Sequence, residues 1–325
     1  MHFRTEINIP KSDWTFDHQS QILTIGSCFS DVIGTTLKSY KFPTLVNPFG
    51  TIFNPISLFK LLNASIDNSY LHQDYFIQNG DIWYNYDFHS SLSSSFKNEL
   101  FEMIRGKITE VHEFLKTAEV ITITLGSAFV YRLLPNGEII SNCHKKPASF
   151  FQKELLKVED ITSAFEHFNI KLNQLNPNVK VIFTVSPVRH IKDTLVLNNV
   201  SKSTLVLATH QICEKYNNCY YFPSYEIMMD DLRDYRFYKD DFLHPTTFAE
   251  KYIWEKFITT FTNENTQEII RKWETIASAI MHKPFHPEST AHQQFLKDTL
   301  KKLIEISLVL EVNEEISLIK KNIIE

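Results

Sequence analysis

The sequence predicts an α/β fold built on a parallel, doubly wound sheet. Short runs of apolar or β-branched residues, typical of buried strands, alternate along the chain with stretches of helical periodicity. Several of these runs end directly in glycine or serine, so that each leads into a turn. A chain of 325 residues is also long enough to bury a large core, as one large domain or two smaller ones.

The composition excludes several classes of protein. A hydrophobic fraction of 43% and a charged fraction of 22% indicate a globular chain, not a disordered one. The net charge of −5, with lysine and arginine scattered along the chain, offers no track for a nucleic-acid partner. No apolar run approaches about 18 residues and the N-terminus lacks a signal-peptide pattern, so we expect a cytoplasmic protein without a membrane partner.

The stretch Gln21–Asp31, read Q-I-L-T-I-G-S-C-F-S-D, predicts a buried strand, a tight turn and a helix over Ser30–Tyr40. The turn places two candidate nucleophiles, Ser27 and Cys28, at the positive end of that helix. Free backbone N–H groups there can hold an oxyanion. A Gly-Ser turn after a strand is also common structural punctuation, so catalysis requires a base from elsewhere in the chain.

The four cysteines are expected to be free thiols, because their spacings match neither a disulfide framework nor a zinc motif. Before residue 118 we predict an irregular lead-in over residues 1–20, a loop over Lys41–Pro55, a short helix over Ile56–Leu62, an aromatic β-hairpin over Leu71–Ser95 and a helix over Phe96–Thr117. The aromatic residues of the hairpin either line a substrate cleft or pack on the core.

The remaining elements continue the alternation of strands and helices. They are a strand over Glu119–Ser127, a hairpin around Pro135–Gly137, a helix over Asp160–Leu175 capped by Asp160 or Thr162, a strand over Val179–Val185, a helix over Lys202–Tyr216, a strand over Cys219–Phe222 and a helix over Phe248–Phe261. Residues 1–262 form the predicted catalytic domain. Residues 263–325 form a helical extension that packs on it, with Leu310–Ile324 as a candidate homo-oligomer contact.

A candidate base follows the last strand, where ligands bind in doubly wound sheets. His244 stands in a short loop just before a helix whose start is predicted by a capping box at Thr247 and Glu250. Asp241, three residues earlier, can accept the imidazole N–H and select the tautomer of the ring. A histidine before proline is usually structural. Together with the turn that carries Ser27 and Cys28, called the nucleophile turn below, the Asp241–His244 pair supplies the parts of a catalytic triad.

Five short motifs in order resemble the signature of the GSCFA family, over roughly residues 20–290. The motifs are Gly26-Ser27-Cys28-Phe29-Ser30, Asn47-Pro48-Phe49-Gly50-Thr51, Asn142-Cys143-His144-Lys145, Ser186-Pro187-Val188-Arg189-His190 and Asp241-Phe242-Leu243-His244-Pro245. That family is in turn similar to the SGNH, or GDSL-like, hydrolases, which cleave or transfer acyl groups. The resemblance implies a three-layer, flavodoxin-like parallel sheet of the SGNH type, with inserted hairpins and a C-terminal helical extension.

In the wider group the nucleophile is the third residue of the first block, which here is Cys28. The resemblance therefore implies a Cys28–His244–Asp241 triad, with Ser27 as the alternative nucleophile. We expect the helix N-terminus and a nearby imidazole to lower the pKa of the Cys28 thiol. The alternative for Cys28 is a small buried residue at a strand–helix turn.

The oxyanion donors are less clearly marked, because the Gly-x-Asn block of the wider group is replaced by Gly126-Ser127-Ala128. Asn142 or Ser127 is expected to take the place of the missing asparagine. The Gly50 N–H is a further expected donor, although Gly50 is equally typical of a simple turn. His190 is a second candidate base. The candidate oxyanion and substrate-binding residues are thus Gly50, Asn142, Ser127, His144, His190 and Arg189.

We expect an enzyme that hydrolyses or transfers an acyl group on a carbohydrate or other small O-acyl substrate, without a cofactor. The alternative is a non-catalytic ligand-binding or interaction protein that keeps the same scaffold. A third interpretation is a metalloenzyme that uses several of the histidines, but no ligand spacing supports it. Those histidines are His72, His89, His144 and His190.

Overall fold

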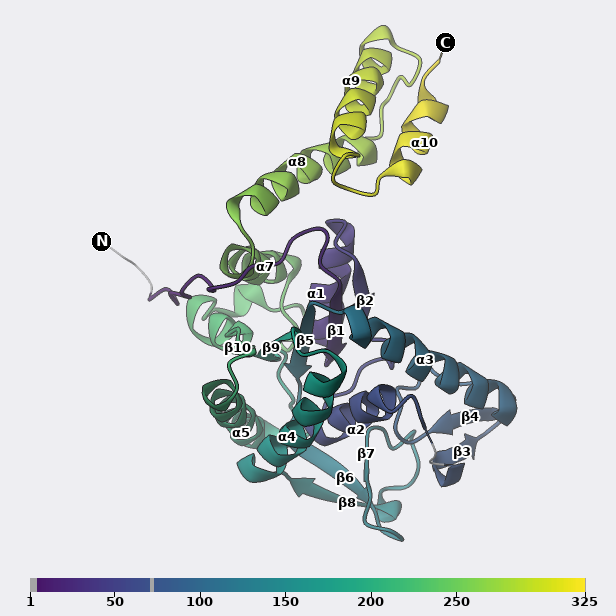
Figure 1. Ribbon diagram of the computed structural model, residues 1–325, viewed down its shortest axis with the longest axis vertical. Helices are drawn as coiled ribbons and strands as arrows, with labels where there is room; N and C mark the ends of the chain where they lie inside the picture. Colours follow the sequence, from purple (N-terminus) through teal and green to yellow (C-terminus); the bar gives the residue numbers. More distant parts are fainter. Residues whose placement is uncertain (1–4, 71–72, 325) are drawn as a thin grey trace. The chain divides into compact units, whose positions relative to one another are not determined.

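The computed structural model describes residues 5–70 and 73–324, and a five-stranded parallel sheet forms its centre (Figure 1). Its strands are β1 (Ile22–Gly26), β2 (Thr44–Val46), β5 (Val120–Leu125), β9 (Lys180–Val185) and β10 (Cys219–Tyr221). They lie in the order β10-β9-β5-β1-β2, which in chain order is the 2-1-3-4-5 arrangement of flavodoxin-like sheets. The predicted α/β class and parallel sheet are confirmed.

The helices of the described residues are α1 (Cys28–Ser39), α2 (Pro55–Ile66), α3 (Lys97–Thr117), α4 (Val158–Leu175), α5 (Thr194–Lys215), α6 (Ser224–Glu226), α7 (Thr247–Phe261), α8 (Glu264–Met281), α9 (Thr290–Ile306) and α10 (Asn313–Asn322). Helices α1 to α5 and α7 lie near the predicted positions, with differences at their ends, whereas the short α6 was not predicted and α8, α9 and α10 form the predicted helical extension. Short 3₁₀ turns cover Gln73–Tyr75, Ala148–Phe150 and Tyr235–Phe237, and a π-helical turn covers Ile227–Asp231.

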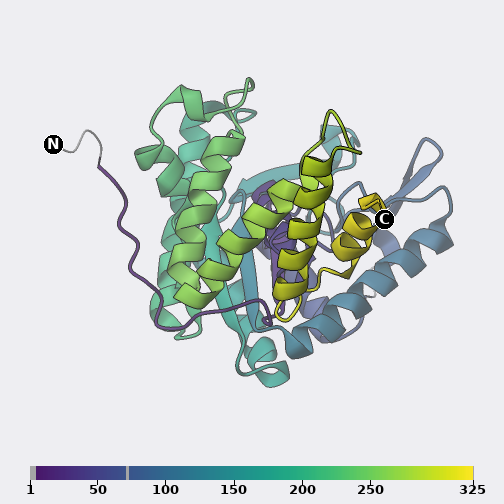
Figure 2. The same cartoon turned by 90° about the horizontal axis from the view of Figure 1, so that it is seen from above.

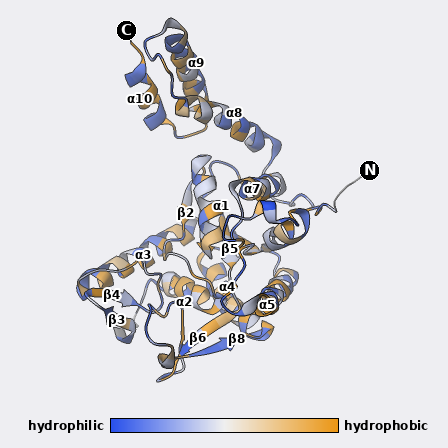
Figure 3. Cartoon of the chain, turned by 180° about the vertical axis from the view of Figure 1, so that it is seen from behind, coloured by the Kyte–Doolittle hydropathy of each residue, from blue (hydrophilic) through white to orange (hydrophobic). Residues whose placement is uncertain are grey.

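Alternate residues of the central strands face opposite sides of the sheet. One face carries Leu23, Ile123 and Phe183, which pack in a single buried cluster with apolar residues of α2, α3, α4 and α5. On the opposite face α1 approaches so closely that a Cβ atom on Gly34 would lie 2.2 Å from Thr24 Oγ1. Helices therefore cover both faces, and in Figure 3 these helices carry both hydrophobic and hydrophilic residues.

Two antiparallel insertions interrupt the doubly wound pattern. The first is the hairpin of β3 (Phe76–Asn79) and β4 (Ile82–Asn85), which lies beside α3 (Figure 2). The second contains β6 (Phe129–Leu133) and β7 (Ile139–Ile140), with β8 (Phe151–Leu155) as a third strand that the sequence did not indicate. Both predicted hairpins are confirmed within the described residues; residues 71–72 lie outside them. Tyr75, Tyr86 and Phe88 are buried, so the aromatic residues of the first insertion belong to the core.

Several predicted boundaries are wrong. The stretch Lys41–Pro55 is not only loop, because it contains β2, and α5 begins eight residues before the predicted Lys202. Neither Asp160 nor Thr162 caps α4: the Asp160 carboxylate lies inside the first turn and accepts from the backbone N–H of Lys157. Helix α7 is capped by Thr246, whose hydroxyl accepts from the Ala249 N–H, and not by the box at Thr247 and Glu250.

The chain divides into two compact units. Of the described residues, the first contains 5–9, 21–35, 44–70 and 73–257, and the second contains 10–20, 36–43 and 258–324. In the second unit, α8, α9 and α10 bury a core of their own that includes Trp273, Leu303 and Ile319. Leu310 and Val312 are buried in that same core, so the apolar residues that suggested a homo-oligomer contact are largely used within the unit.

Among the described residues, no helix combines the length and the hydropathy needed to cross a membrane. The predicted cytoplasmic location stays a prediction.

Two glycines of the first unit should respond to alanine in opposite directions. Gly26 has φ +134°, and an added Cβ would lie 2.1 Å from the Thr124 carbonyl oxygen. Gly106 lies on an exposed stretch of α3 with no atom within 4 Å of an added Cβ. We expect Gly26→Ala to destabilise the protein by about 3 kcal/mol or more, and Gly106→Ala to stabilise it by about 0.5–1 kcal/mol.

Urea unfolding followed by circular dichroism measures both changes. Equal and small effects of the two substitutions would contradict the close approach of β1 to β5 at Gly26.

Candidate functional site

The turn after β1 places Ser27 and Cys28 at the carboxyl edge of the sheet, between the ends of β1 and β5. The Ser27 N–H donates to the Thr124 carbonyl at 2.9 Å, which continues the β1–β5 ladder by one residue. Ser27 is 1% exposed, and its hydroxyl accepts from the Phe29 N–H at 3.3 Å. Ser27 therefore caps helix α1, whose first residue is Cys28.

The side chain of Asn47 holds this turn from the end of β2. Its Oδ1 accepts from the Gly26 N–H at 2.9 Å, and its Nδ2 donates to the Ser27 carbonyl at 3.4 Å. Asn47 is buried and has φ +37°, a backbone conformation that asparagine tolerates better than most residues. One amide thus satisfies a buried donor and a buried acceptor of the nucleophile turn.

Cys28 is half-buried, and its thiol is less acidic than expected. Burial, together with the charge of Asp31, raises the pKa of the Cys28 thiol, whereas Lys202 and the backbone N–H groups of Cys28 and Phe29 lower it by less. The expectation of a lowered pKa is therefore wrong, because the apolar surroundings outweigh the helix N-terminus. Within the turn, Cys28 is nevertheless the more accessible of the two candidate nucleophiles.

Asp241 and His244 form the predicted pair. The Asp241 Oδ2 lies 2.6 Å from His244 Nδ1, and its Oδ1 accepts from the backbone N–H groups of Leu243 and His244 at 2.8 and 3.0 Å. These bonds hold the pKa of the Asp241 carboxyl well below its usual range. A charged carboxylate on Nδ1 favours the tautomer that leaves Nε2 as the proton acceptor.

The loop of this pair is attached to the segment after β9. The Arg189 guanidinium donates to the Phe242 carbonyl at 2.6 Å and stacks on the ring of Tyr238, 4.1 Å from its centroid. Phe242 has φ +57°, so the loop is held in a conformation that a phenylalanine rarely adopts. Arg189 thus supports the loop that carries Asp241 and His244, and its contact with substrate stays a prediction.

A buried polar stripe on α5 meets the ends of β5 and β9. Asn198 accepts from the His190 N–H at 2.8 Å, and Ser201 accepts from the Ala128 N–H at 2.8 Å. Lys202, one helical turn after Asn198, donates from Nζ to the carbonyl oxygens of Gly126 and Ser186, at 2.9 and 2.8 Å. Residues spaced three and four apart share one helix face, so α5 presents these three side chains together.

His190 shares the Gly126 carbonyl with Lys202, because its Nε2 also donates to that oxygen at 2.9 Å. Burial, and then the charge of Lys202, lowers the pKa of His190 to about 4. A ring with this pKa and with Nε2 already donating is a weak proton acceptor. His190 is therefore a poor candidate for the base, and the charge of His244 is one of the smaller influences on it.

The expected oxyanion donors are occupied by bonds within the protein. The Gly50 N–H donates to the Asn47 carbonyl at 2.7 Å, and the Ser127 N–H donates to the Phe53 carbonyl at 3.0 Å. The Ser127 hydroxyl accepts from the Phe129 N–H at 3.0 Å. The Cys28 N–H remains as a candidate donor, because a first helical residue has no carbonyl partner inside its helix.

Asn142 and His144 lie in a separate cluster beside β4. Asn142 donates to the Ser90 hydroxyl at 3.3 Å and accepts from the His144 N–H. His144 is 4% exposed, and its Nε2 donates to the Asn85 carbonyl at 2.8 Å. Both side chains thus take part in holding the inserted strands, and Asn142 as an oxyanion donor stays a prediction.

His72, one histidine of the metalloenzyme interpretation, lies outside the described residues. Within them, no group of three or more histidine, cysteine, aspartate or glutamate side chains is arranged to hold a metal ion.

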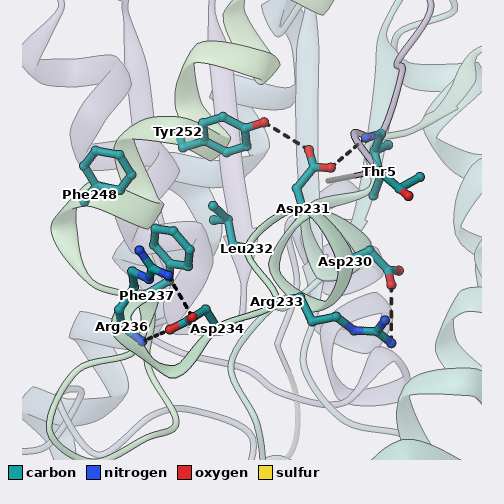
Figure 4. A pocket seen from close by; sticks show the side chains of 11 residues that line it. Thr5, Asp230, Asp231, Leu232, Arg233, Asp234, Arg236, Phe237, Phe248 and Tyr252 are labelled. Carbon is teal, nitrogen blue, oxygen red and sulfur yellow. Dashed lines mark hydrogen bonds and ion pairs between the residues drawn. The ribbon is translucent and has the colours of Figure 1, made fainter. Parts of the chain in front are cut away.

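A cavity of about 1180 Å³ lies beside the π-helical turn and α7, and none of the predicted site residues lines it (Figure 4). Phe237 and Phe248 stack on one side, with ring centroids 5.8 Å apart. Asp231 accepts from the Ile7 N–H at 2.7 Å and from the Tyr252 hydroxyl at 3.1 Å. The charged groups of this cavity are thus paired with one another or with the backbone.

Two protein-family models match the chain. The model of the GSCFA family matches residues 21–257, and the model described as GSCFA domain protein, C-terminal domain, matches residues 273–325. The chain belongs to the GSCFA family. The larger match covers β1 to α7 and contains both the nucleophile turn and the Asp241–His244 loop. No curated protein sequence matches this member of the family.

Sequence reasoning missed the roles of Asn47 and Lys202. Asn47 was part of a family motif but was assigned no role, because the neighbouring sequence does not show that its amide bonds a turn 21 residues earlier in the chain. Lys202 was read as the first residue of a helix. The spacing of Asn198, Ser201 and Lys202 could have revealed a polar stripe, but only after α5 was known to begin at Thr194.

Removing the Asn47 amide should loosen the nucleophile turn. Asn47→Ala leaves the buried Gly26 N–H without its acceptor, so we expect a loss of about 1–3 kcal/mol in the free energy of unfolding. The matched control is Asn173→Ala on the exposed side of α4, which should change stability by less than about 0.5 kcal/mol. Urea unfolding separates the two; a similar small effect of both would contradict the role of Asn47.

Lys202 should make stability depend on pH. Burial lowers its pKa from the usual 10.5 to about 7, so between these values the native state binds fewer protons than the unfolded state. Its contribution to the free energy of unfolding is therefore full above pH 10.5, falls as the pH decreases, and is lost below about pH 7.

Relative to Lys202→Met, the wild type should gain about 2 kcal/mol between about pH 7 and pH 9. Urea unfolding of both proteins across this pH range measures the gain. A stability difference that stays constant with pH would show that Lys202 keeps an ordinary pKa.

Proposed function

We propose that this protein is an acyl-ester hydrolase or O-acyltransferase of the SGNH-like type, with Cys28 as nucleophile, His244 as base and Asp241 as the residue that orients His244. The observation that carries the proposal is the Asp241–His244 pair, fixed by three hydrogen bonds in a loop attached to the segment after β9. A carboxylate that needed only to stabilise a loop would not require the imidazole contact.

The position of Cys28 supports the same reading. The ends of β1 and β5 flank the point where the strand order of the sheet reverses, which is where doubly wound folds bind their ligands. Lys202 interacts electrostatically with both Cys28 and His190, and His190 with His244. Ser27 is the weaker candidate, because its hydroxyl is buried and caps α1.

The proposed reaction has two steps. The Cys28 thiol gives its proton to His244 Nε2, and the sulfur attacks the ester carbonyl carbon while the carbonyl oxygen takes up the electron pair. The Cys28 N–H stabilises that oxyanion. The tetrahedral intermediate then expels the alkoxide, which receives the proton from His244, and the acyl group remains on sulfur as a thioester.

Water or the hydroxyl group of an acceptor then attacks the thioester, and His244 accepts the proton of the attacking group. The second tetrahedral intermediate expels the Cys28 sulfur, which takes the proton back from His244. The carboxylic acid or the new ester leaves, and the Cys28 thiol is restored. Hydrolysis and transfer differ only in which nucleophile completes this step. A carbohydrate or another small O-acyl compound is the proposed substrate class, by analogy with enzymes of this fold.

Brief incubation with p-nitrophenyl acetate, followed by intact-mass spectrometry and peptide mapping, tests the nucleophile. We expect one acetyl group on Cys28 and none in Cys28→Ala. His244→Ala should slow acetylation by about 100-fold or more, since general base catalysis typically contributes that much. Cys143→Ala, which removes another partly exposed thiol, is the control and should acetylate like the wild type.

Acetylation of Ser27 instead of Cys28 would overturn the assignment of the nucleophile but keep the enzyme. An unlabelled protein that turns the ester over no faster than buffer does would contradict the proposed function altogether.

A non-catalytic binding protein on the same scaffold is the second candidate. The raised pKa of the Cys28 thiol and the occupied Gly50, Ser127 and Asn142 donors favour it. The binding-protein hypothesis predicts that a ligand raises the melting temperature of Cys28→Ala as much as that of the wild type. The enzyme hypothesis predicts acetylation of Cys28 in the wild type.

A further inference from the structure

Lys202 is a buried lysine whose charge has no carboxylate counter-ion among the described residues. Its side chain is 0% exposed, and its Nζ bonds only the carbonyl oxygens of Gly126 and Ser186. An ammonium group taken out of water is costly unless an anion or several dipoles compensate for it. Two carbonyl oxygens leave the third N–H of the ammonium without an acceptor in the described part of the chain.

The backbone of Gly126, to which Lys202 is bonded, lies directly against the nucleophile turn. A Cβ atom added to Gly126 would lie only 3.1 Å from the Cβ of Ser27, the residue before Cys28. Gly126 therefore links the two, because its carbonyl accepts from Lys202 and its Cα packs against Ser27. A side chain at position 126 would require Ser27 or the neighbouring Phe53 to shift by a few tenths of an ångström.

The charged and titratable groups around Lys202 come from three elements besides α5. Cys28, at the start of α1, interacts electrostatically with Lys202 and is also close to the Asp31 charge. His190, after β9, is bonded to the same carbonyl as Lys202 and is also influenced by Asp193 and His244. The ring of Tyr225 on α6 has its centroid 5.8 Å from Lys202 Nζ. Of these groups, the Cys28 thiolate is the anion that acts on Lys202.

We propose that Lys202 is a positioning residue that serves as the buried counter-charge of the Cys28 thiolate, held in place by the Gly126 and Ser186 carbonyls. This inference deepens the proposed function and rests on its assignment of Cys28 as the nucleophile. The positive charge of Lys202 favours the ionised thiol, against the opposing effects of burial and Asp31. In return, the thiolate favours the charged form of Lys202.

The test is the rate at which iodoacetamide alkylates Cys28, followed by peptide mass mapping from about pH 5 to pH 10. Only the thiolate reacts, so the rate reports ionisation of this one thiol without requiring enzyme turnover. The wild type is compared with Lys202→Met, which keeps the length of the side chain without its charge, and with Lys202→Arg, which keeps a charge at every pH tested.

At about pH 6, where Lys202 holds its proton, we expect Lys202→Met to alkylate about tenfold more slowly than the wild type, equivalent to about one pKa unit. The wild-type rate should also bend near pH 7, because Lys202 loses its proton there and the thiolate loses its counter-charge. The bend should be absent from both variants, and Lys202→Arg should keep the faster rate at low pH.

Lys60→Met is the matched control. Lys60 also donates to a backbone carbonyl, that of Ile139, and pairs with Asp87, but it is not among the charges that act on Cys28. It should leave the alkylation profile unchanged. A folded Lys202→Met protein with the wild-type profile would overturn the proposal and reduce Lys202 to a structural link between β5 and β9.

If Lys202→Met does not fold, the reciprocal measurement decides. The lysine Cε and Nζ signals of Cys28→Asp and of Cys28→Ala are titrated by nuclear magnetic resonance. The carboxylate of Cys28→Asp stays charged while Lys202 titrates, so the coupling requires a higher Lys202 pKa in Cys28→Asp than in Cys28→Ala. The same Lys202 pKa in both variants would overturn the proposal.

The two hypotheses can fail separately. If Cys28 alkylation depends on Lys202 but p-nitrophenyl acetate does not acetylate the protein, the proposed enzyme activity is refuted and the coupling of Lys202 to Cys28 stands. Acetylation of Cys28 with no dependence on Lys202 would do the reverse.

Discussion

The close contact between Gly26 and Thr124 is the constraint on which the rest of the site depends. The end of β1 must approach β5 without a side chain, and its φ of +134° requires glycine. This contact extends the parallel ladder to Ser27, starts helix α1 at Cys28 and brings Asn47 within reach of the turn. The position of the candidate nucleophile therefore follows from backbone packing before any chemistry is considered.

The parts of the fold that the sequence predicted correctly are those in which burial produces a strong periodic signal. Strands β1, β5 and β9 are buried runs of apolar and β-branched residues, and their order follows the alternation with helices. The three-residue strand β2 could not be seen, because prolines flank it and pairing with β1, not its own pattern, makes it a strand. The start of α5 was missed because Asn198 is buried while Val196 is exposed, the reverse of an ordinary helix.

The candidate site divides in the same way between local and distant interactions. The Asp241–His244 pair was predictable, since three residues in a tight loop determine it. The links from Arg189 to Phe242 and from Lys202 to Gly126 join residues 53 and 76 positions apart, and no spacing rule indicates them. The acidity of Cys28 was mispredicted for a related reason: the helix terminus is visible in the sequence, but the surroundings that desolvate the thiol come from the whole fold.

The second unit combines the C-terminal helices with segments from the N-terminal part of the chain, so the units do not follow a single cut in the sequence. The indole of Trp273 donates to the Ser39 carbonyl across 234 residues, and Tyr40 and Lys41 bond Glu274 and Glu315. Residues 36–43 therefore have their packing partners in α8 and α10. A chain that ended before residue 273, where the C-terminal family match begins, would lack these partners of residues 36–43. The C-terminal helices therefore help to hold the last turn of α1 in place.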